Sequence, residues 1–322
     1  MIDMVNFEHS NRKNMRILSI VLLLGLITFS GYSQQDPQYT QYMYNMNIVN
    51  PAYAGSRGTL SIGLLGRTQW VGISDAPKTA TLSIHAPVGK NLAAGFSAIA
   101  DSYGPVNEQN IYADLSYTIT TSEEGRFAFG LKGGITLFDV GLLSDIIPPQ
   151  TVPGVDRLFQ DDINEIFPNF GAGVYYYTDK FYAGLSAPNL LETKHLEKQS
   201  GTITRASEKM HYFFTSGYVF DLSETLKLKP SFMAKAVSGA PLSLDVTANM
   251  LFNDRLELGL NYRLDDSIGG LVNFGVTPDL RIGYAYDYTT SNLGNFNSGT
   301  HEMFLLWDID FSKKNLKSPR FF

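Results

Sequence analysis

The chain contains no cysteine and few charged residues, and both shortages restrict what it can be. Without cysteine it has no disulfide, no thiolate metal ligand and no cysteine nucleophile. Charged residues make up only 17% of the 322 residues, and 31 acidic residues against 25 basic ones exclude a basic nucleic-acid-binding protein. Hydrophobic residues make up 44% of the chain, which excludes a disordered one. The abundant residues are Tyr, Phe and Gly, a composition that favours β-structure and is compatible with a membrane-spanning barrel.

The N-terminus has the pattern of an export signal. A basic stretch at residues 11–16 precedes an apolar run at residues 17–29, and the small residues Gly31 and Ser33 stand before Gln34. We therefore predict a cleaved signal peptide over residues 1–33, with Met15 as an alternative start. The other interpretation is a membrane anchor, but the apolar run is shorter than the roughly 20 residues that span a bilayer. The mature protein is expected to leave the cytoplasm.

From residue 59 onward, apolar and polar residues alternate with a period of two. The alternation marks strands with one apolar and one polar face, and it is clearest at 241–250 and 255–264. Fourteen segments follow it: 59–67, 78–86, 92–102, 108–119, 126–138, 169–178, 180–187, 208–220, 226–237, 241–250, 255–264, 267–276, 279–288 and 300–311.

The connections between these segments alternate in length. Every second one is short, as at 87–91, 120–125 and 251–254, and all the long ones fall in between, at 68–77, 139–168, 188–207 and 289–299. Short turns on one side and long loops on the other are typical of outer-membrane barrels. We predict an all-β fold, a transmembrane antiparallel up-and-down barrel of about 14 strands. An even strand number then places both termini on the short-turn, periplasmic side.

The alternative is a soluble β-sandwich or a lipocalin-like barrel, whose apolar faces would form the core. Two features favour the membrane barrel. The polar faces carry charges of both signs, interpreted as pairs of Arg255 with Glu257 and of Arg281 with Asp287. The apolar faces end in aromatic residues, which suits interfacial girdles. These are Tyr175, Tyr177, Tyr212, Phe214, Tyr284, Tyr286, Tyr288, Trp307 and Phe311.

No residue pattern predicts a catalytic, cofactor-binding or metal-binding site. No two histidines have zinc-site spacing, and His85 is expected to be a hydrogen-bonding residue of the lumen wall. Asp161, Asp162 and Glu165 lack the spacing of a calcium-binding loop, so a solvated acidic loop is expected there. The paired glycines near 133 and 172 lie within strands, where they permit close backbone approach or a bend.

Residues 34–58 are neither signal nor strand. They are dense in Tyr, Asn and Gln and contain two Asx-Pro turn signals. A barrel of fourteen strands has room inside for more than wall side chains. We predict that this segment is a lumen plug or a docking arm for a partner; the other interpretation is a leader packed beneath the barrel.

Several motifs stand out along the chain: Asp36-Pro37-Gln38-Tyr39-Thr40-Gln41-Tyr42-Met43, Asn50-Pro51-Ala52-Tyr53-Ala54-Gly55-Ser56, Gln69-Trp70-Val71-Gly72 with Ala76-Pro77-Lys78, Gly283 to Tyr288 with Leu293-Gly294, Ser298 to Glu302, and Ser318-Pro319-Arg320-Phe321-Phe322. In combination they resemble one family, the PorP/SprF proteins of the Bacteroidetes type IX secretion system. One departure is Asn45-Met46, where many members have Asn-Pro.

The resemblance implies a non-enzymatic outer-membrane barrel without a cofactor. Its implied partners are the periplasmic lipoprotein ring (PorK and PorN, or GldK and GldN), a secreted adhesin-like protein used in gliding, and outer-membrane lipid, with no nucleic acid. Residues 36–56 and the basic tail would then lie on the periplasmic side, and the tail would meet an acidic partner or lipid phosphate. The candidate docking residues are Asp36, Pro37, Gln38, Tyr39, Gln41, Tyr42, Asn50, Pro51, Tyr53, Gly55, Gln69, Trp70, Lys313, Lys314, Lys317 and Arg320.

The chain is thus expected to comprise a signal peptide (1–33), a periplasmic or plug segment (34–58), a barrel (59–311) and a periplasmic tail (312–322). The predicted function is an accessory or adhesin-anchoring component of type IX secretion. One alternative is a channel for small solutes. Another is an outer-membrane lipase that would use a serine near His85.

Overall fold

The structure is a computed structural model that describes residues 38–141, 163–191, 194–195, 206–207 and 210–311. All of them lie within one compact unit of the chain, residues 35–322. The predicted signal peptide, Asp36, Pro37, Asp161, Asp162 and the C-terminal tail lie outside the described residues, so those predictions remain predictions.

Most of the described chain is strand, and very little of it is helix. Strands of seven to fifteen residues alternate in direction along the chain, and each hydrogen-bonds to the next. They are β1 (Leu60–Thr68), β2 (Lys78–Pro87), β3 (Leu92–Tyr103), β4 (Val106–Thr120), β5 (Arg126–Val140), β6 (Ile163–Tyr177), β7 (Phe181–Ala187), β10 (His211–Tyr218), β12 (Leu226–Val237), β13 (Ser243–Phe252), β14 (Leu256–Arg263), β15 (Ser267–Gly275), β16 (Leu280–Thr289) and β17 (Thr300–Ile309).

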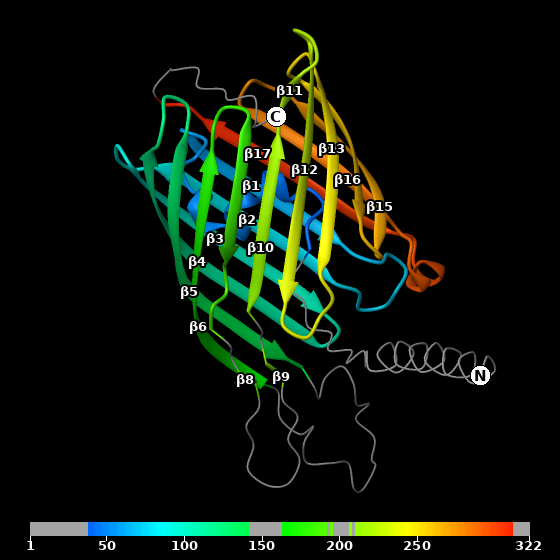
Figure 1. The fold of residues 1–322 in the computed structure, drawn as a ribbon. Helices are drawn as coiled ribbons and strands as arrows, with labels where there is room; N and C mark the ends of the chain where they lie inside the picture. Colours follow the sequence, from blue (N-terminus) through cyan, green and yellow to red (C-terminus); the bar gives the residue numbers. More distant parts are fainter. Residues whose placement is uncertain (1–37, 142–162, 192–193, 196–205, 208–209, 312–322) are drawn as a thin grey trace, which may run out of the picture. The chain divides into compact units, whose positions relative to one another are not determined.

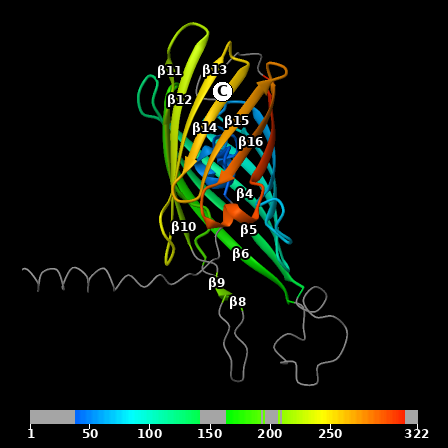
Figure 2. The same cartoon turned by 90° about the vertical axis from the view of Figure 1, so that its right-hand side faces the viewer.

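These fourteen strands close into a barrel, shown from two sides in Figures 1 and 2. β1 pairs with β17, so the first and last strands are neighbours, and β10 pairs with both β7 and β12. The two-residue strand β11 (Phe220–Asp221) extends β10, because Gly217 lies opposite Ser231 and Phe220 opposite Leu228 in one unbroken register. The predicted antiparallel barrel of about 14 strands is confirmed.

Two details differ from the sequence prediction. β6 begins at Ile163, six residues before the predicted start, and pairs with β5 over its whole length. A separate two-stranded ribbon of β8 (Lys194–His195) and β9 (Ala206–Ser207) lies in a connection that was predicted to have no strand. A strand of two residues is too short to show any alternation. The start of β6, Ile-Asn-Glu-Ile-Phe-Pro, also fails to alternate between apolar and polar residues, so neither feature could be predicted.

The two ends of the barrel differ in their connections. We call the end with residues 88–91, 121–125, 178–180, 222–225, 253–255 and 276–279 the short-turn end. The opposite, long-loop end has the connections 69–77, 104–105, 141–162, 188–210, 238–242, 264–266 and 290–299. β1 starts and β17 finishes at the short-turn end, so this end also leads to the C-terminal tail.

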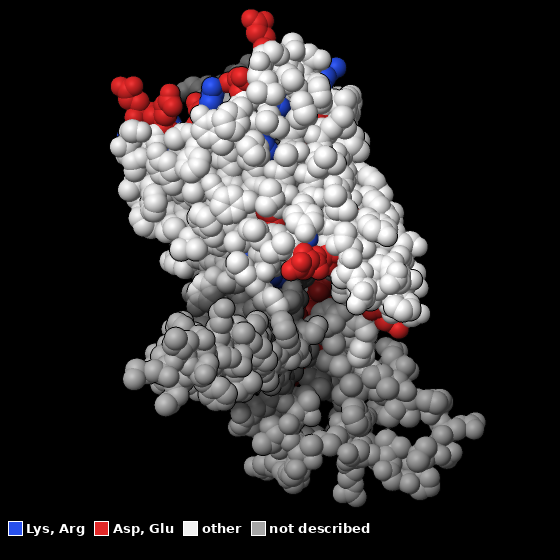
Figure 3. All heavy atoms as spheres, turned by 45° about the vertical axis from the view of Figure 1, so that its right-hand side comes forward, with Lys and Arg blue, Asp and Glu red and all other residues white. Residues whose placement is uncertain are grey.

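Burial in the wall is the reverse of that in a soluble protein. In β14, Leu258 and Leu260 point outward and are 45% and 70% exposed, whereas Glu257 and Asn261 point inward and are 0% and 3% exposed. On the face in Figure 3, much of the wall is uncharged, and charged side chains gather near the upper edge and around one hollow lower down. An apolar belt outside and a polar interior are what a lipid bilayer requires, and this arrangement excludes the soluble sandwich.

Most of the predicted aromatic girdle faces outward. Tyr212, Tyr284, Tyr288, Trp307 and Phe311 are all exposed on the outer face. The prediction was wrong for two tyrosines of β6, Tyr175 and Tyr177, which point into the barrel and are only 2% and 7% exposed. Aromatic residues alone do not distinguish the lipid-facing side from an interior that is filled by other aromatic residues.

The interior is filled by residues 38–58, which we call the inner segment. It consists of three short helical turns: η1 (Tyr42–Tyr44), α2 (Met46–Val49) and η2 (Pro51–Tyr53). The only other helical element among the described residues is η4 (Asn292–Phe296), in a long-loop connection. Both views show the inner segment, coloured blue, within the ring of strands.

None of the helices in the described part of the chain is long and apolar enough to cross a membrane.

Candidate functional site

The inner segment forms the centre of the candidate site, and it is almost completely enclosed. Every residue from 39 to 57 except Gly55 is buried. Local sequence dictates the turn at its middle. Asn50 precedes a proline and is extended (φ −136°, ψ 111°), as the proline ring requires. Pro51 occupies the first position of η2, and the Asn50 side chain caps that turn by accepting a hydrogen bond from the Ala52 N–H at 3.0 Å.

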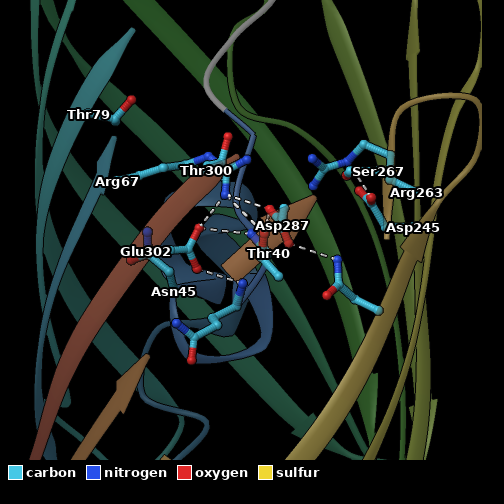
Figure 4. Close-up of polar contacts among 12 residues, drawn as sticks. Thr40, Asn45, Arg67, Thr79, Asp245, Arg263, Ser267, Asp287, Thr300 and Glu302 are labelled. Atoms are coloured by element: carbon cyan, nitrogen blue, oxygen red, sulfur yellow. Dashed lines mark hydrogen bonds and ion pairs between the residues drawn. The ribbon is translucent and has the colours of Figure 1, made fainter. Parts of the chain in front are cut away.

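A buried charge cluster of Arg67, Asp287 and Glu302 holds the start of the inner segment (Figure 4). The Glu302 carboxylate accepts two backbone hydrogen bonds, from the Thr40 N–H at 2.9 Å and the Gln41 N–H at 2.7 Å. One guanidinium nitrogen of Arg67 lies 2.9 Å from Glu302 and 3.2 Å from Asp287, and the Thr40 hydroxyl donates to Asp287. Hydrogen bonds in which the donor or the acceptor is charged are among the stronger ones. The cluster therefore fixes the backbone at residues 40–41.

The predicted ion pairs were assigned to the wrong partners. Arg281 pairs with Glu257 of β14 at 3.6 Å, and Asp287 pairs with Arg67. Arg281 and Asp287 are six residues apart on one strand, which is roughly 20 Å, so they are too far apart to pair. Arg255, predicted to pair with Glu257, is exposed.

A second buried pair supports the middle of the inner segment. Lys132 of β5 lies 3.2 Å from Asp114 of β4 and also donates to the Asn47 and Ile48 carbonyl oxygens, at 3.3 and 3.4 Å. Asp114 accepts a hydrogen bond from the Asn47 side chain at 3.0 Å. The end of α2 thus has its carbonyl groups satisfied by a lysine ammonium, as the unpaired carbonyls of a helix end require.

Glycines in the wall make room for η2. A methyl group at Gly130 of β5 would lie 2.1 Å from the Ala52 nitrogen, and one at Gly173 of β6 would lie 2.2 Å from Asn50 Oδ1. The Asn50 side chain also donates to the Val174 carbonyl at 3.0 Å. The expectation that strand glycines near 133 and 172 permit close backbone approach is confirmed at Gly171, where a methyl group would lie 2.4 Å from the Pro188 carbonyl oxygen. At Gly173 the close neighbour is the Asn50 side chain.

At the short-turn end, the inner segment is fastened by an ion pair. Arg57 donates to both carboxylate oxygens of Asp308 in β17, with Nε 2.8 Å from Oδ1. His85 accepts a hydrogen bond from the Gly55 N–H at 3.2 Å and packs edge-on against Tyr53, with ring centroids 5.4 Å apart. His85 therefore has the wall role predicted for it.

Most predicted docking residues lie inside the barrel. Tyr39, Gln41, Tyr42, Asn50, Pro51 and Tyr53 are buried, and Gln38 and Gly55 are half-buried. Gln69 and Trp70 lie apart from them, in the connection 69–77 at the long-loop end, and are half-buried. Asp36, Pro37, Lys313, Lys314, Lys317 and Arg320 are outside the described residues. Their role in docking stays a prediction for all of them.

The two family-like motifs at the long-loop end contact each other. The Trp70 N–H donates to the Thr300 hydroxyl at 3.2 Å, and Val71 exchanges backbone hydrogen bonds with Gly299 and Ser298 at 2.9 and 2.7 Å. Trp70 has a positive φ of 46°, which is uncommon for a bulky residue and is maintained by these contacts. The connection 69–77 is therefore held in place against the start of β17.

Sequence reasoning missed the residues that fasten the inner segment, namely Arg67, Asp114, Glu302 and Asp308. The available signal was a charged side chain at an inward position of a membrane strand, where an unpaired charge is costly. That signal identifies the side chains but not their partners. In the described residues, no group of three histidine or carboxylate side chains is arranged to hold a metal ion.

The family model described as "Type IX secretion system membrane protein PorP/SprF" matches residues 31–307. The chain belongs to this family. It is thus an outer-membrane barrel protein of type IX secretion. No curated protein matches the chain.

Three solved structures are similar to this PorP/SprF protein in fold. Omp33 of Acinetobacter baumannii is 8% identical, with a TM-score of 0.45 over 78% of this chain and 98% of that one. The toluene transporter TbuX of Ralstonia pickettii is 10% identical, with a TM-score of 0.48 over 81% and 92%. A FadL homologue of Pseudomonas aeruginosa is 11% identical, with a TM-score of 0.43 over 85% and 95%. At these values none of them indicates a shared function.

Proposed function

We propose that this protein is a non-enzymatic scaffold of type IX secretion that links the periplasmic lipoprotein ring to the export or surface anchoring of a partner adhesin. The observation that carries the proposal is the filled lumen. The inner segment is buried from residue 39 to 57 apart from Gly55, and ion pairs or charged hydrogen bonds fasten both its ends. Such an interior disfavours passage of solutes. It favours a rigid barrel that holds partners at its short-turn end and its long-loop end.

The proposal includes an orientation. Outer-membrane barrels have short periplasmic turns and long extracellular loops. The short-turn end of this barrel, from which β17 leads to the C-terminal tail, then faces the periplasm. The tail carries Lys313, Lys314, Lys317 and Arg320, and we propose that these cations contact an acidic surface of the ring or lipid phosphate.

Co-purification from the native outer membrane tests this function. The tagged, detergent-solubilised protein is expected to recover ring lipoproteins or a large secreted adhesin, identified by mass spectrometry. Reversing the four tail charges to glutamate should reduce ring recovery because rim charges set association. The matched control is Lys78→Glu, an exposed lysine at the start of β2 on the long-loop end.

The outcomes separate the two claims. A wild-type protein that recovers neither class of partner contradicts the scaffold function. Full ring recovery by the tail variant, equal to that of Lys78→Glu, refutes the role of the tail while leaving the scaffold function in place.

A further inference from the structure

The inner segment is fastened at two points on a single strand. The Glu302 carboxylate accepts hydrogen bonds from the backbone N–H groups of residues 40 and 41, and Asp308 forms an ion pair with Arg57. Both carboxylates belong to β17, and six residues at about 3.3 Å each separate them by roughly 20 Å along the strand. Because β17 runs from the long-loop end at Thr300 to the short-turn end at Ile309, the inner segment spans most of the length of this strand.

The first described residues lie at the long-loop end. Gln38 and Tyr39 line a cavity together with residues within three positions of the long-loop ends of their strands, among them Glu108 of β4, Lys235 of β12 and Ser243 of β13. The cluster that holds Thr40 is also at this end, since Glu302 is the third residue of β17 and Arg67 the penultimate residue of β1.

The inner segment leaves the barrel interior at the other end. Gly55 and Gly58 adopt positive φ values of 74° and 76°, and the Gly58 N–H donates to the Gly55 carbonyl at 3.0 Å. This glycine turn reverses the chain so that β1 can begin at Leu60 in the wall. Residues with a Cβ rarely adopt these angles, and a methyl group at Gly55 would in addition lie 2.2 Å from the Ala93 side chain.

We infer that the inner segment runs through the barrel from the long-loop end to the short-turn end, so that the amino end of the mature chain emerges at the cell surface. The inference rests on the orientation proposed above. It replaces the expectation that both termini face the periplasm: only the C-terminal end does. The amino end would then be accessible to an extracellular partner at the end of the barrel that carries the long loops.

The absence of cysteine makes a labelling test direct. Single-cysteine variants are treated with a membrane-impermeant maleimide on intact cells and, in parallel, after outer-membrane permeabilisation. Gln38→Cys is the test, Ser74→Cys in the connection 69–77 marks the long-loop end, and Ser223→Cys marks the short-turn end; Ser74 and Ser223 are exposed. An epitope inserted after Gln34 and detected by antibody on intact cells gives a second readout that does not depend on the half-buried Gln38.

We expect Gln38→Cys and Ser74→Cys to react on intact cells to nearly the extent seen after permeabilisation, Ser223→Cys to react only after it, and the epitope to be detected on intact cells. If Ser74→Cys behaves this way but the epitope and Gln38→Cys become accessible only together with Ser223→Cys, the inferred path of the inner segment is refuted and the orientation stands. If Ser223→Cys reacts on intact cells and Ser74→Cys does not, the proposed orientation fails. If Gln38→Cys stays unreactive throughout, the epitope alone decides.

Discussion

Replacement of Arg67 by methionine is expected to destabilise the barrel by about 3–5 kcal/mol, because it leaves the buried carboxylates of Asp287 and Glu302 facing each other without their cation. Both carboxylates are almost fully buried, so water cannot compensate for the lost charge. The measurement is urea-induced unfolding from phospholipid vesicles, followed by the fluorescence of Trp70 and Trp307.

Two further variants make this result specific. Adding Glu302→Gln to Arg67→Met removes one of the two negative charges and should recover part of the lost stability. Lys180→Met removes the cation of an ion pair with Asp221 whose two side chains are 49% and 40% exposed, so it should leave the unfolding transition unchanged. Equal effects of Arg67→Met and Lys180→Met would show that the buried cluster does not stabilise the protein.

A single methyl group at Gly130 is expected to displace η2. The new Cβ would lie 2.1 Å from the Ala52 nitrogen and 2.4 Å from the Pro51 carbonyl carbon, and backbone atoms cannot rotate away as a side chain can. Overpacking of this kind typically costs about 1–3 kcal/mol. Gly130→Ala should therefore unfold at lower urea concentration and allow trypsin to cleave after Arg57, whose side chain is only 7% exposed in the wild type.

The same strand offers a matched control. A methyl group at Gly133 would meet only the Phe170 ring, at 3.8 Å, which is an ordinary contact. Gly133→Ala should therefore match or slightly exceed the wild type in stability, because alanine restricts the unfolded chain more than glycine does. A protein that responds alike to both substitutions would contradict the close packing of η2 against β5.

The wall of the barrel could be predicted from sequence because its signal is local. In β14, Leu258 and Leu260 alternate with Glu257 and Asn261 within one strand, so period and strand type can be read from a few residues. The alternation does not show whether an aromatic residue faces the lipid or packs against the inner segment. Tyr175 was assigned to the lipid side, yet its ring packs against Tyr53 of the inner segment, with centroids 5.5 Å apart.

The contacts of the inner segment could not be predicted, for a different reason. Its dense Tyr, Asn and Gln content indicated a hydrogen-bonding segment, but its partners are distant in sequence. Thr40 and Glu302 are 262 residues apart, and only the closure of fourteen strands brings them together. The Arg281–Asp287 assignment failed in the same way, because neighbours along one strand were preferred to partners on other strands.

These separations also bear on the order of folding. The middle of the inner segment has partners nearby in the chain, since Asn47 and Asp114 are 67 residues apart. Its two ends have to wait for β17, as Thr40 and Arg57 meet partners 262 and 251 residues away. Contacts of such long range are formed late because closing a long loop is entropically costly. The two ends of the inner segment are therefore expected to be fixed last, when β17 joins β1 and the wall closes around them.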